Sequence, residues 1–305
     1  MQTPEYTHKM MLAIEGLIRR AAALQVPLML KGSMLSRQYF KDPTVRYTHD
    51  VDWVYLDPLI DQEHAVSKLD PMMIAITESK EFDGIRFRSF RENQFWRKID
   101  YAMADDFPTI NTDILTFIGE EEVEIRSVDI SFNLEIDPAA VPLTYVPLTG
   151  EPFVIPYTAP LALQVSWKLH QTLVNPRLKD LFDLTHLLQH PQFTAETRAQ
   201  TIRALLSECR RDRLPAVNLA YLASGQIHLL FTKEPLQKTW NFWRLGLFEY
   251  NGNISEYSAP FWNITDADKL PLTVEDFIQD FYTQFYAAGF DKDSFAAYEQ
   301  PSGKV

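Results

Sequence analysis

Residues 28–55 read LMLKGSMLSRQYFKDPTVRYTHDVDWVY, and this stretch decides how the first half of the chain is interpreted. The apolar run that ends at Gly32 predicts a buried strand followed by a tight turn. The next eight residues, SMLSRQYF, predict a short helix with Ser33 in the position of a helix cap. Residues 41–49 are polar and contain a proline, which predicts a loop. Residues 50–56, DVDWVYL, alternate polar and apolar side chains, which is the period of a second strand.

Composition limits the classes of protein to consider. The chain has 305 residues, of which 46% are hydrophobic and 13% aromatic, enough for a packed core. Its formal charge of −12 argues against a protein that coats nucleic acid non-specifically, although RNA could still bind at one local basic patch. The single cysteine, Cys209, excludes a disulfide framework and fits a reducing compartment. No apolar run is long enough for a transmembrane helix, so we expect a cytoplasmic protein with no membrane partner.

The pattern of predicted secondary structure changes near residue 160, from mixed helices and strands to helices. Before that point the pattern predicts helices over 6–24 and 60–79 and strands that include 124–136, with Met10, Met11, Ile14, Leu17 and Ile18 on one face of the first helix. After it the pattern predicts helices over 161–174, 178–190 and 195–213, and a helical remainder to about residue 298. We therefore expect an α+β protein with two domains. Residues 1–157 would form a small mixed β-sheet flanked by helices, and residues 158–305 an α-helical domain.

Two aspartates in the second strand carry the chemistry. Asp50 and Asp52 point the same way, with α-carbons roughly 6–7 Å apart, and their charges repel. Mg²⁺, with Mn²⁺ as an alternative, would relieve this repulsion because it prefers hard oxygen ligands and is usually completed by substrate phosphates. Asp129, in SVDIS, is the best candidate for a third carboxylate; Glu124 and Glu135 are its rivals.

A third carboxylate would allow two ions about 3.5–4 Å apart. Such a pair polarises the α-phosphate of a nucleotide, activates an attacking hydroxyl and stabilises the pyrophosphate that leaves. The Lys31-Gly32-Ser33 corner then has a role beside the carboxylates. Glycine lets the backbone approach a phosphate closely, and the serine supplies a donor for the triphosphate.

The order of these motifs resembles a known enzyme class. A Gly-Ser corner, a helix, a loop and then Asp-x-Asp look like the nucleotidyltransferases with a DNA polymerase β-like fold. More narrowly, KGSMLSRQYF followed by RYTHDVDWV resembles the AbiEii/AbiGii toxin family. That family also has a helical lysine and an Arg-x-Lys-Asp-x-x-Asp segment. VSWKLHQTLV and RLKDLFDL match them and supply Lys168, Arg177, Lys179, Asp180 and Asp183.

The resemblance implies an enzyme that transfers a nucleoside monophosphate from an NTP to an acceptor in the presence of Mg²⁺. It implies the toxin of a bacterial toxin–antitoxin or phage-defence system, with RNA, at the 3′ end of tRNA, as acceptor and a cognate antitoxin as partner. Residues 1–157 would be the nucleotidyltransferase domain, and residues 158–305 would complete the active-site cleft. The implied catalytic residues are Asp50, Asp52, Asp129, Lys168 and Asp183. The first three would bind metal, with Asp129 as the third ligand or as the general base. The implied nucleotide-binding residues are Lys31, Gly32, Ser33, Lys179 and Asp180.

Three other interpretations remain open at this stage. The acceptor could be a small molecule, as in antibiotic-type nucleotidyltransferases, or a protein hydroxyl. The chain could also be a nucleotide-binding module without turnover. Finally, Asp180 and Asp183 could simply pair with Arg177 and Lys179 along their helix.

Overall fold

The computed structural model describes residues 4–80, 84–99, 108–232, 235–250, 253–256 and 264–298. The chain divides into two compact units. Unit 1 contains Met1–Gln38 and Tyr47–Ala159, and unit 2 contains Tyr39–Arg46, Pro160–Tyr257 and Trp262–Val305. The loop before Asp50 therefore belongs partly to unit 2, and the chain returns to unit 1 directly after Arg46.

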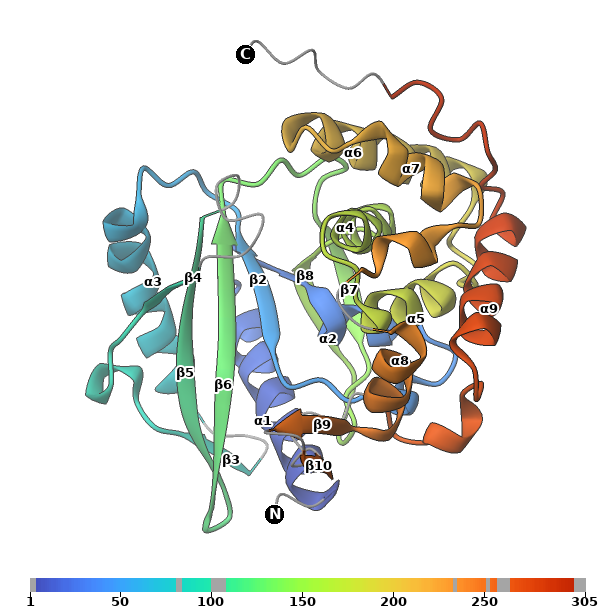
Figure 1. The fold of residues 1–305 in the computed structure, drawn as a ribbon. Helices are drawn as coiled ribbons and strands as arrows, with labels where there is room; N and C mark the ends of the chain where they lie inside the picture. Colours follow the sequence, from blue (N-terminus) through green and yellow to red (C-terminus); the bar gives the residue numbers. More distant parts are fainter. Residues whose placement is uncertain are drawn as a thin grey trace. The chain divides into compact units, whose positions relative to one another are not determined.

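Unit 1 is built on a mixed sheet that has eight strands within the described residues. The strand order is β3-β5-β6-β2-β1-β8-β7, and β4 pairs with β5. β2 runs parallel to β6 and β1 parallel to β8, whereas the other pairs are antiparallel. Figure 1 shows β5, β6 and β2 lying side by side. The strands are β1 (Leu28–Lys31), β2 (Val51–Tyr55), β3 (Ile85–Phe87), β4 (Arg97–Ile99), β5 (Thr109–Ile118), β6 (Glu121–Phe132), β7 (Val141–Tyr145) and β8 (Phe153–Thr158).

Helices flank this sheet, so the predicted α+β class is confirmed. The helices of unit 1 are α1 (Pro4–Ala23), α2 (Gly32–Ser36) and α3 (Gln62–Thr77). α1 packs against β5, β6 and β8 and contacts α3. The five apolar residues that the sequence places on its inner face are all buried, as the 3.6-residue period requires: Met10, Met11, Ile14, Leu17 and Ile18.

The opening stretch folds in the predicted order of strand, turn, helix, loop and strand. One detail of the prediction is wrong, because Ser33 does not cap the helix. α2 begins at Gly32, its N-cap is Lys31, and Ser33 lies inside the helix, where it is buried. The chain turns at Gly32 itself, which has a φ of +73°, so the N-cap lies two residues earlier than expected.

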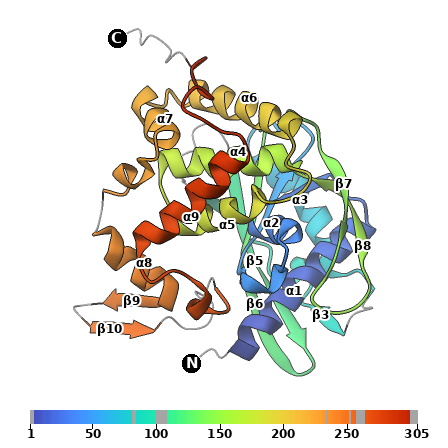
Figure 2. The ribbon, with the colours of Figure 1, turned by 90° about the vertical axis from the view of Figure 1, so that its right-hand side faces the viewer.

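Unit 2 is mainly helical (Figure 2). α4 packs against α5, α6 and α7, and α9 packs against α5 and α8. The three helices predicted after residue 160 are confirmed. The helices are α4 (Leu161–Val174), α5 (Leu178–Leu187), α6 (Ala195–Arg211), α7 (Ala216–Ala223), α8 (Leu236–Leu245) and α9 (Val274–Ala287).

The prediction of an entirely helical remainder is wrong. β9 (Leu247–Tyr250) and β10 (Asn253–Glu256) form an antiparallel pair. The sequence LFEYNGNISE places Asn-Gly between two short runs, which is the strongest short-range hairpin signal and should have outweighed the helical context. No helix among the described residues has a segment both long and apolar enough to cross a membrane.

Candidate active site

Five polar side chains form one row across five neighbouring strands of unit 1. Lys31 of β1 is paired with Asp52 of β2, and Asp52 is paired with Asp129 of β6. Asp129 is in turn paired with Asn111 of β5, and Asn111 with Arg97 of β4. Residues paired in this way lie about 5 Å apart and point to the same face of the sheet. The carboxylate that the sequence selected as third, Asp129, is therefore the direct cross-strand neighbour of Asp52.

The Gly32 corner lies against the carboxylate of Asp52. A Cβ placed on Gly32 would come within 1.9 Å of Oδ2 and 2.7 Å of Cγ of Asp52. Lys31 directly precedes Gly32, and its Nζ lies 3.8 Å from Asp52 Oδ1; both side chains are about one-fifth exposed. Glycine at this position thus allows the backbone to turn tightly beside Asp52 while a cation remains next to its charge.

The other two predicted residues of this region lie on the elements that flank the row. Asp50 is half-buried and directly precedes the first residue of β2. Ser33 is buried in α2, a helix that contacts both β1 and β2.

The chemistry of Asp52 and Asp129 fits a hard divalent cation. Each supplies carboxylate oxygens, and Mg²⁺ takes one or two protein carboxylates with waters and substrate phosphates as its remaining ligands. Within the part of the chain that the structure describes, no group of three or more His, Cys, Asp or Glu side chains is gathered in a way that could hold a metal ion. Asp50 as a third ligand therefore stays a prediction.

A second cluster of charges lies in unit 2, between α4 and α5. Lys168 Nζ is 2.6 Å from Asp183 Oδ2 and 3.3 Å from Asp180 Oδ1. All three side chains are buried. Burial acts to lower the pKa of Lys168, but the attraction of Asp183 and Asp180 outweighs it, and the pKa is raised. Lys168 is therefore held as an ammonium ion, and its predicted contact with a phosphate stays a prediction.

Two arginines complete this cluster. Arg177 Nε lies 2.6 Å from Asp180 Oδ2, and Arg46 Nε lies 3.1 Å from Asp183 Oδ1. Burial would raise the pKa of Asp180, but Lys168 and then Arg177 lower it to about 2. The ion pairs described here thus join three cations, Lys168, Arg46 and Arg177, to the two carboxylates of Asp180 and Asp183. Lys179, the fifth predicted residue of this segment, is half-buried on α5.

Sequence reasoning missed Arg46, Asn111 and Arg97. Arg46 is the first residue of RYTHD, so its position in the quoted motif was a usable signal. Asn111 begins an alternating run, NTDIL, which predicts that it shares a strand face with Asp113. Nothing in the sequence shows that β4 pairs with β5, and the role of Arg97 depends on that pairing.

Comparison with known proteins decides the family. Residues 17–256 match the family model described as nucleotidyl transferase AbiEii toxin, type IV toxin–antitoxin system. The chain belongs to the AbiEii family. The AbiEii match includes every residue of both clusters, from Lys31 to Asp183, and confirms the predicted nucleotidyltransferase toxin.

The fold of this AbiEii chain is similar to that of MenT4, a nucleotidyltransferase toxin from Mycobacterium tuberculosis. The TM-score is 0.55, and the sequences are 14% identical over 96% of this chain and 89% of that chain. At this identity the likeness shows the fold alone. No curated protein sequence matches the chain significantly.

Proposed function

We propose that this AbiEii toxin transfers a nucleoside monophosphate from an NTP to RNA, at the 3′ end of tRNA, in a reaction that requires Mg²⁺. One observation carries the proposal: Asp52 and Asp129 are cross-strand neighbours on one face, and Gly32 lies against Asp52. Two carboxylates on neighbouring strands repel each other in a partly dry site, and a cation that lies near both offsets this repulsion. Lys31 supplies one charge, and a divalent ion would supply the rest.

The residues of unit 1 would act on the phosphates and the acceptor. Asp52, Asp129 and Asp50 would hold Mg²⁺, with Mn²⁺ as the substitute ion. When bound, the ion neutralises phosphate charge and polarises the α-phosphate. Lys31 and Gly32, together with Ser33, would bind the triphosphate, since glycine lets the backbone approach a phosphate closely. The acceptor oxygen bonds to the α-phosphorus as the bond to the bridging α–β oxygen breaks, and the hydroxyl proton passes to a base. Asp129 is the candidate for this base as the alternative to its role as the third metal ligand.

The residues of unit 2 would add positive charge and orient the nucleotide. Lys168, kept protonated by its two carboxylates, is suited to act as a point charge on phosphate oxygens. Lys179 and Asp180 would bind the nucleotide, and Asp183 would act near its ribose or base. We assign residues 1–157 to the nucleotidyltransferase domain and residues 158–305 to a helical domain that completes the cleft.

The cellular part of the proposal rests on the family. The description of a type IV toxin–antitoxin system implies a cognate antitoxin. We propose that the toxin acts in the cytoplasm, where RNA and NTPs are present and where its single cysteine would stay reduced.

The test is a transfer assay with the full chain. The protein is incubated with Mg²⁺, each labelled NTP in turn and total tRNA, beside Asp52→Asn. Label on RNA that is lost in Asp52→Asn supports the proposal. Label on a small hydroxylated compound or on protein would instead identify one of the alternative acceptors. Binding of NTP with no transfer to any acceptor would identify an inactive module.

A further inference from the structure

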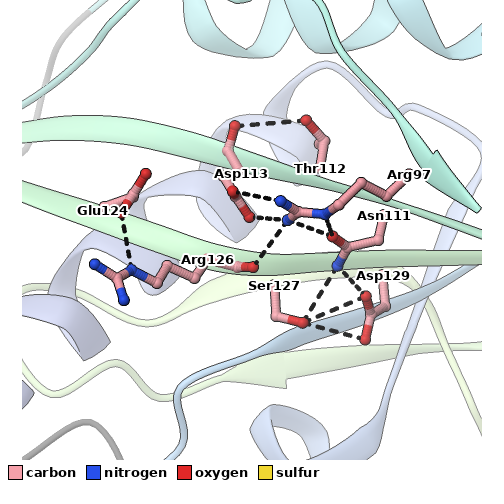
Figure 3. Close-up of polar contacts among 8 residues, drawn as sticks. All are labelled: Arg97, Asn111, Thr112, Asp113, Glu124, Arg126, Ser127 and Asp129. Atoms are coloured by element: carbon pink, nitrogen blue, oxygen red, sulfur yellow. Dashed lines mark hydrogen bonds and ion pairs between the residues drawn. The ribbon is translucent and has the colours of Figure 1, made fainter. Parts of the chain in front are cut away.

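Beyond the two carboxylates, the row of polar residues continues as a hydrogen-bonded network that the sequence does not predict. Arg97, Asn111 and Asp129 lie on β4, β5 and β6 at paired positions of the sheet. Figure 3 shows the amide of Asn111 between the guanidinium of Arg97 and the carboxylate of Asp129. Asn111 and Asp129 are buried, whereas the side chain of Arg97 is 45% exposed.

The contacts fix which way the Asn111 amide faces. Its Oδ1 accepts hydrogen bonds from Arg97 Nε at 2.9 Å and Nη2 at 2.6 Å. Its Nδ2 donates to Asp129 Oδ1 and, at 3.3 Å, to Ser127 Oγ. A guanidinium only donates and an ionised carboxylate only accepts, so the reverse orientation would place donor against donor and acceptor against acceptor. Arg97 therefore determines that Asn111 presents a donor to Asp129.

Arg97 is itself held in place from two sides. Its Nη1 donates to Asp113 Oδ2 at 2.8 Å, and its Nη2 also pairs with Asp113 Oδ1. Nη2 contacts the carbonyl oxygen of Arg126 as well, at 3.4 Å. Because Asp113 stands two residues after Asn111 on the same strand, the guanidinium is clamped beside the amide that it orients.

We propose that Asn111 is the positioning residue for the Asp129 carboxylate and that Arg97 acts through Asn111 by fixing its amide. The inference rests on the proposed function, in which Asp129 is a ligand of the divalent ion. Groups that hydrogen-bond to a ligand fix its orientation, and their loss typically weakens metal affinity or activity by about 10–100-fold. The competing explanation is that the network only joins β4 to β5.

The experiment measures Mn²⁺ binding to the full chain, as the loss of the free-ion electron paramagnetic resonance signal, together with the thermal midpoint. The variants are Asn111→Leu, which keeps the size of the side chain, Arg97→Met, which keeps its stem, and the double variant. Arg126→Met is the matched control, because it removes another guanidinium from the same sheet, and the Arg126 side chain pairs with Glu124 at 2.8 Å. Asp52→Asn defines the loss expected when the site itself is removed.

We expect Asn111→Leu to weaken Mn²⁺ binding about 10–100-fold and Arg97→Met to weaken it less. The double variant should bind Mn²⁺ about as Asn111→Leu does, because the hydrogen bonds described between Arg97 and Asp129 run through Asn111. Arg126→Met should bind as the wild type does. Arg97→Lys, which retains the positive charge and a donor group at the end of the side chain, should recover part of the loss in Arg97→Met.

Unchanged Mn²⁺ affinity in Asn111→Leu and Arg97→Met, with only a lower thermal midpoint, would overturn the inference. If the double variant loses as much binding free energy for Mn²⁺ as the two single variants together, Arg97 does not act through Asn111. If Asn111→Leu does not fold, the pair Arg97→Met and Arg97→Lys decides, since that side chain is half exposed. If the wild type binds Mn²⁺ no more tightly than Asp52→Asn, the proposed metal site itself has failed, and the inference fails with it.

Discussion

Replacing Gly32 by alanine should damage the candidate site more than a similar change at a comparable glycine. The new Cβ would lie 1.9 Å from Oδ2, 2.7 Å from Cγ and 2.9 Å from Cβ of Asp52. Rotation of the Asp52 side chain can move its carboxylate but not its Cβ, which would remain about 0.6 Å inside the shortest normal carbon contact of about 3.5 Å. The backbones of β1 and β2 must therefore separate at the Lys31–Asp52 pair.

Two costs follow from this geometry. The left-handed backbone of residue 32, with a φ of +73°, costs an alanine about 1–2 kcal/mol. Overpacking against Asp52 adds about 1–3 kcal/mol, so Gly32→Ala should lower the free energy of unfolding by about 2–5 kcal/mol. Nucleotidyl transfer should also be lost, because the carboxylate is displaced.

Gly119→Ala is the matched control. Gly119 has a φ of +62°, and nothing lies within 4 Å of its would-be Cβ, so its replacement should cost only the backbone strain of about 1–2 kcal/mol. Urea denaturation and the labelled-NTP assay measure both variants. If Gly32→Ala is no less stable than Gly119→Ala, or transfers nucleotide at the wild-type rate, the close approach of the corner to Asp52 is wrong.

Three further predictions concern buried charges. Lys168→Met leaves Asp180 and Asp183 without their shared cation and should lower the free energy of unfolding by about 3–5 kcal/mol. Arg177→Met, at a side chain that is 42% exposed, should lower it by no more than about 1 kcal/mol. Urea denaturation of both variants measures these losses, and equal losses would contradict the pairing of Lys168 with both carboxylates. The pKa of Asp180 is about 2 in the folded state, against an ordinary value of 3.8, and this difference contributes about 2 kcal/mol of stability. The contribution is present above pH 4 and is lost as the pH falls from 4 towards 2. Asp180→Asn should remove this loss of stability in acid, and an unchanged dependence of stability on pH would refute the prediction. Burial raises the pKa of Glu208 to about 7, so its contribution to stability is favourable below pH 4.5 and is lost as the pH rises through 7. Glu208→Gln should therefore unfold at a higher temperature than the wild type at pH 8 but not at pH 4.5. The same difference in unfolding temperature at both pH values would contradict the burial of the carboxyl group.

The parts of the site that the sequence predicted are those set by local patterns. Alternation in β2 and β6 placed Asp52 and Asp129 on strands, and the glycine that begins α2 marked the turn beside them. The spacing of Asp180 and Asp183 placed both on one face of α5, where the structure has them pairing with Lys168. Each of these inferences needs only the period of a strand or a helix.

The parts that the sequence did not predict depend on pairing between distant segments. The register that aligns Asp52 with Asp129, and Asn111 with Arg97, is set by the packing of the whole sheet. Arg46 and Asp183 are 137 positions apart, so no local pattern connects them. The β9–β10 pair is a different case, because its Asn-Gly signal is local and was overlooked.

The most direct test of the central claim is the Mg²⁺-dependent transfer rate of Asp52→Asn, Asp129→Asn and Glu124→Gln, each measured over a range of Mg²⁺ concentrations. Glu124 is the matched control, because it is an acid of the same strand as Asp129 that pairs with Arg126 instead. The account predicts that both aspartate variants lose nucleotidyl transfer while they keep the fold, and that Glu124→Gln transfers at the wild-type rate with the same Mg²⁺ requirement. Transfer that survives in Asp52→Asn or Asp129→Asn, or that is lost in Glu124→Gln, would contradict it.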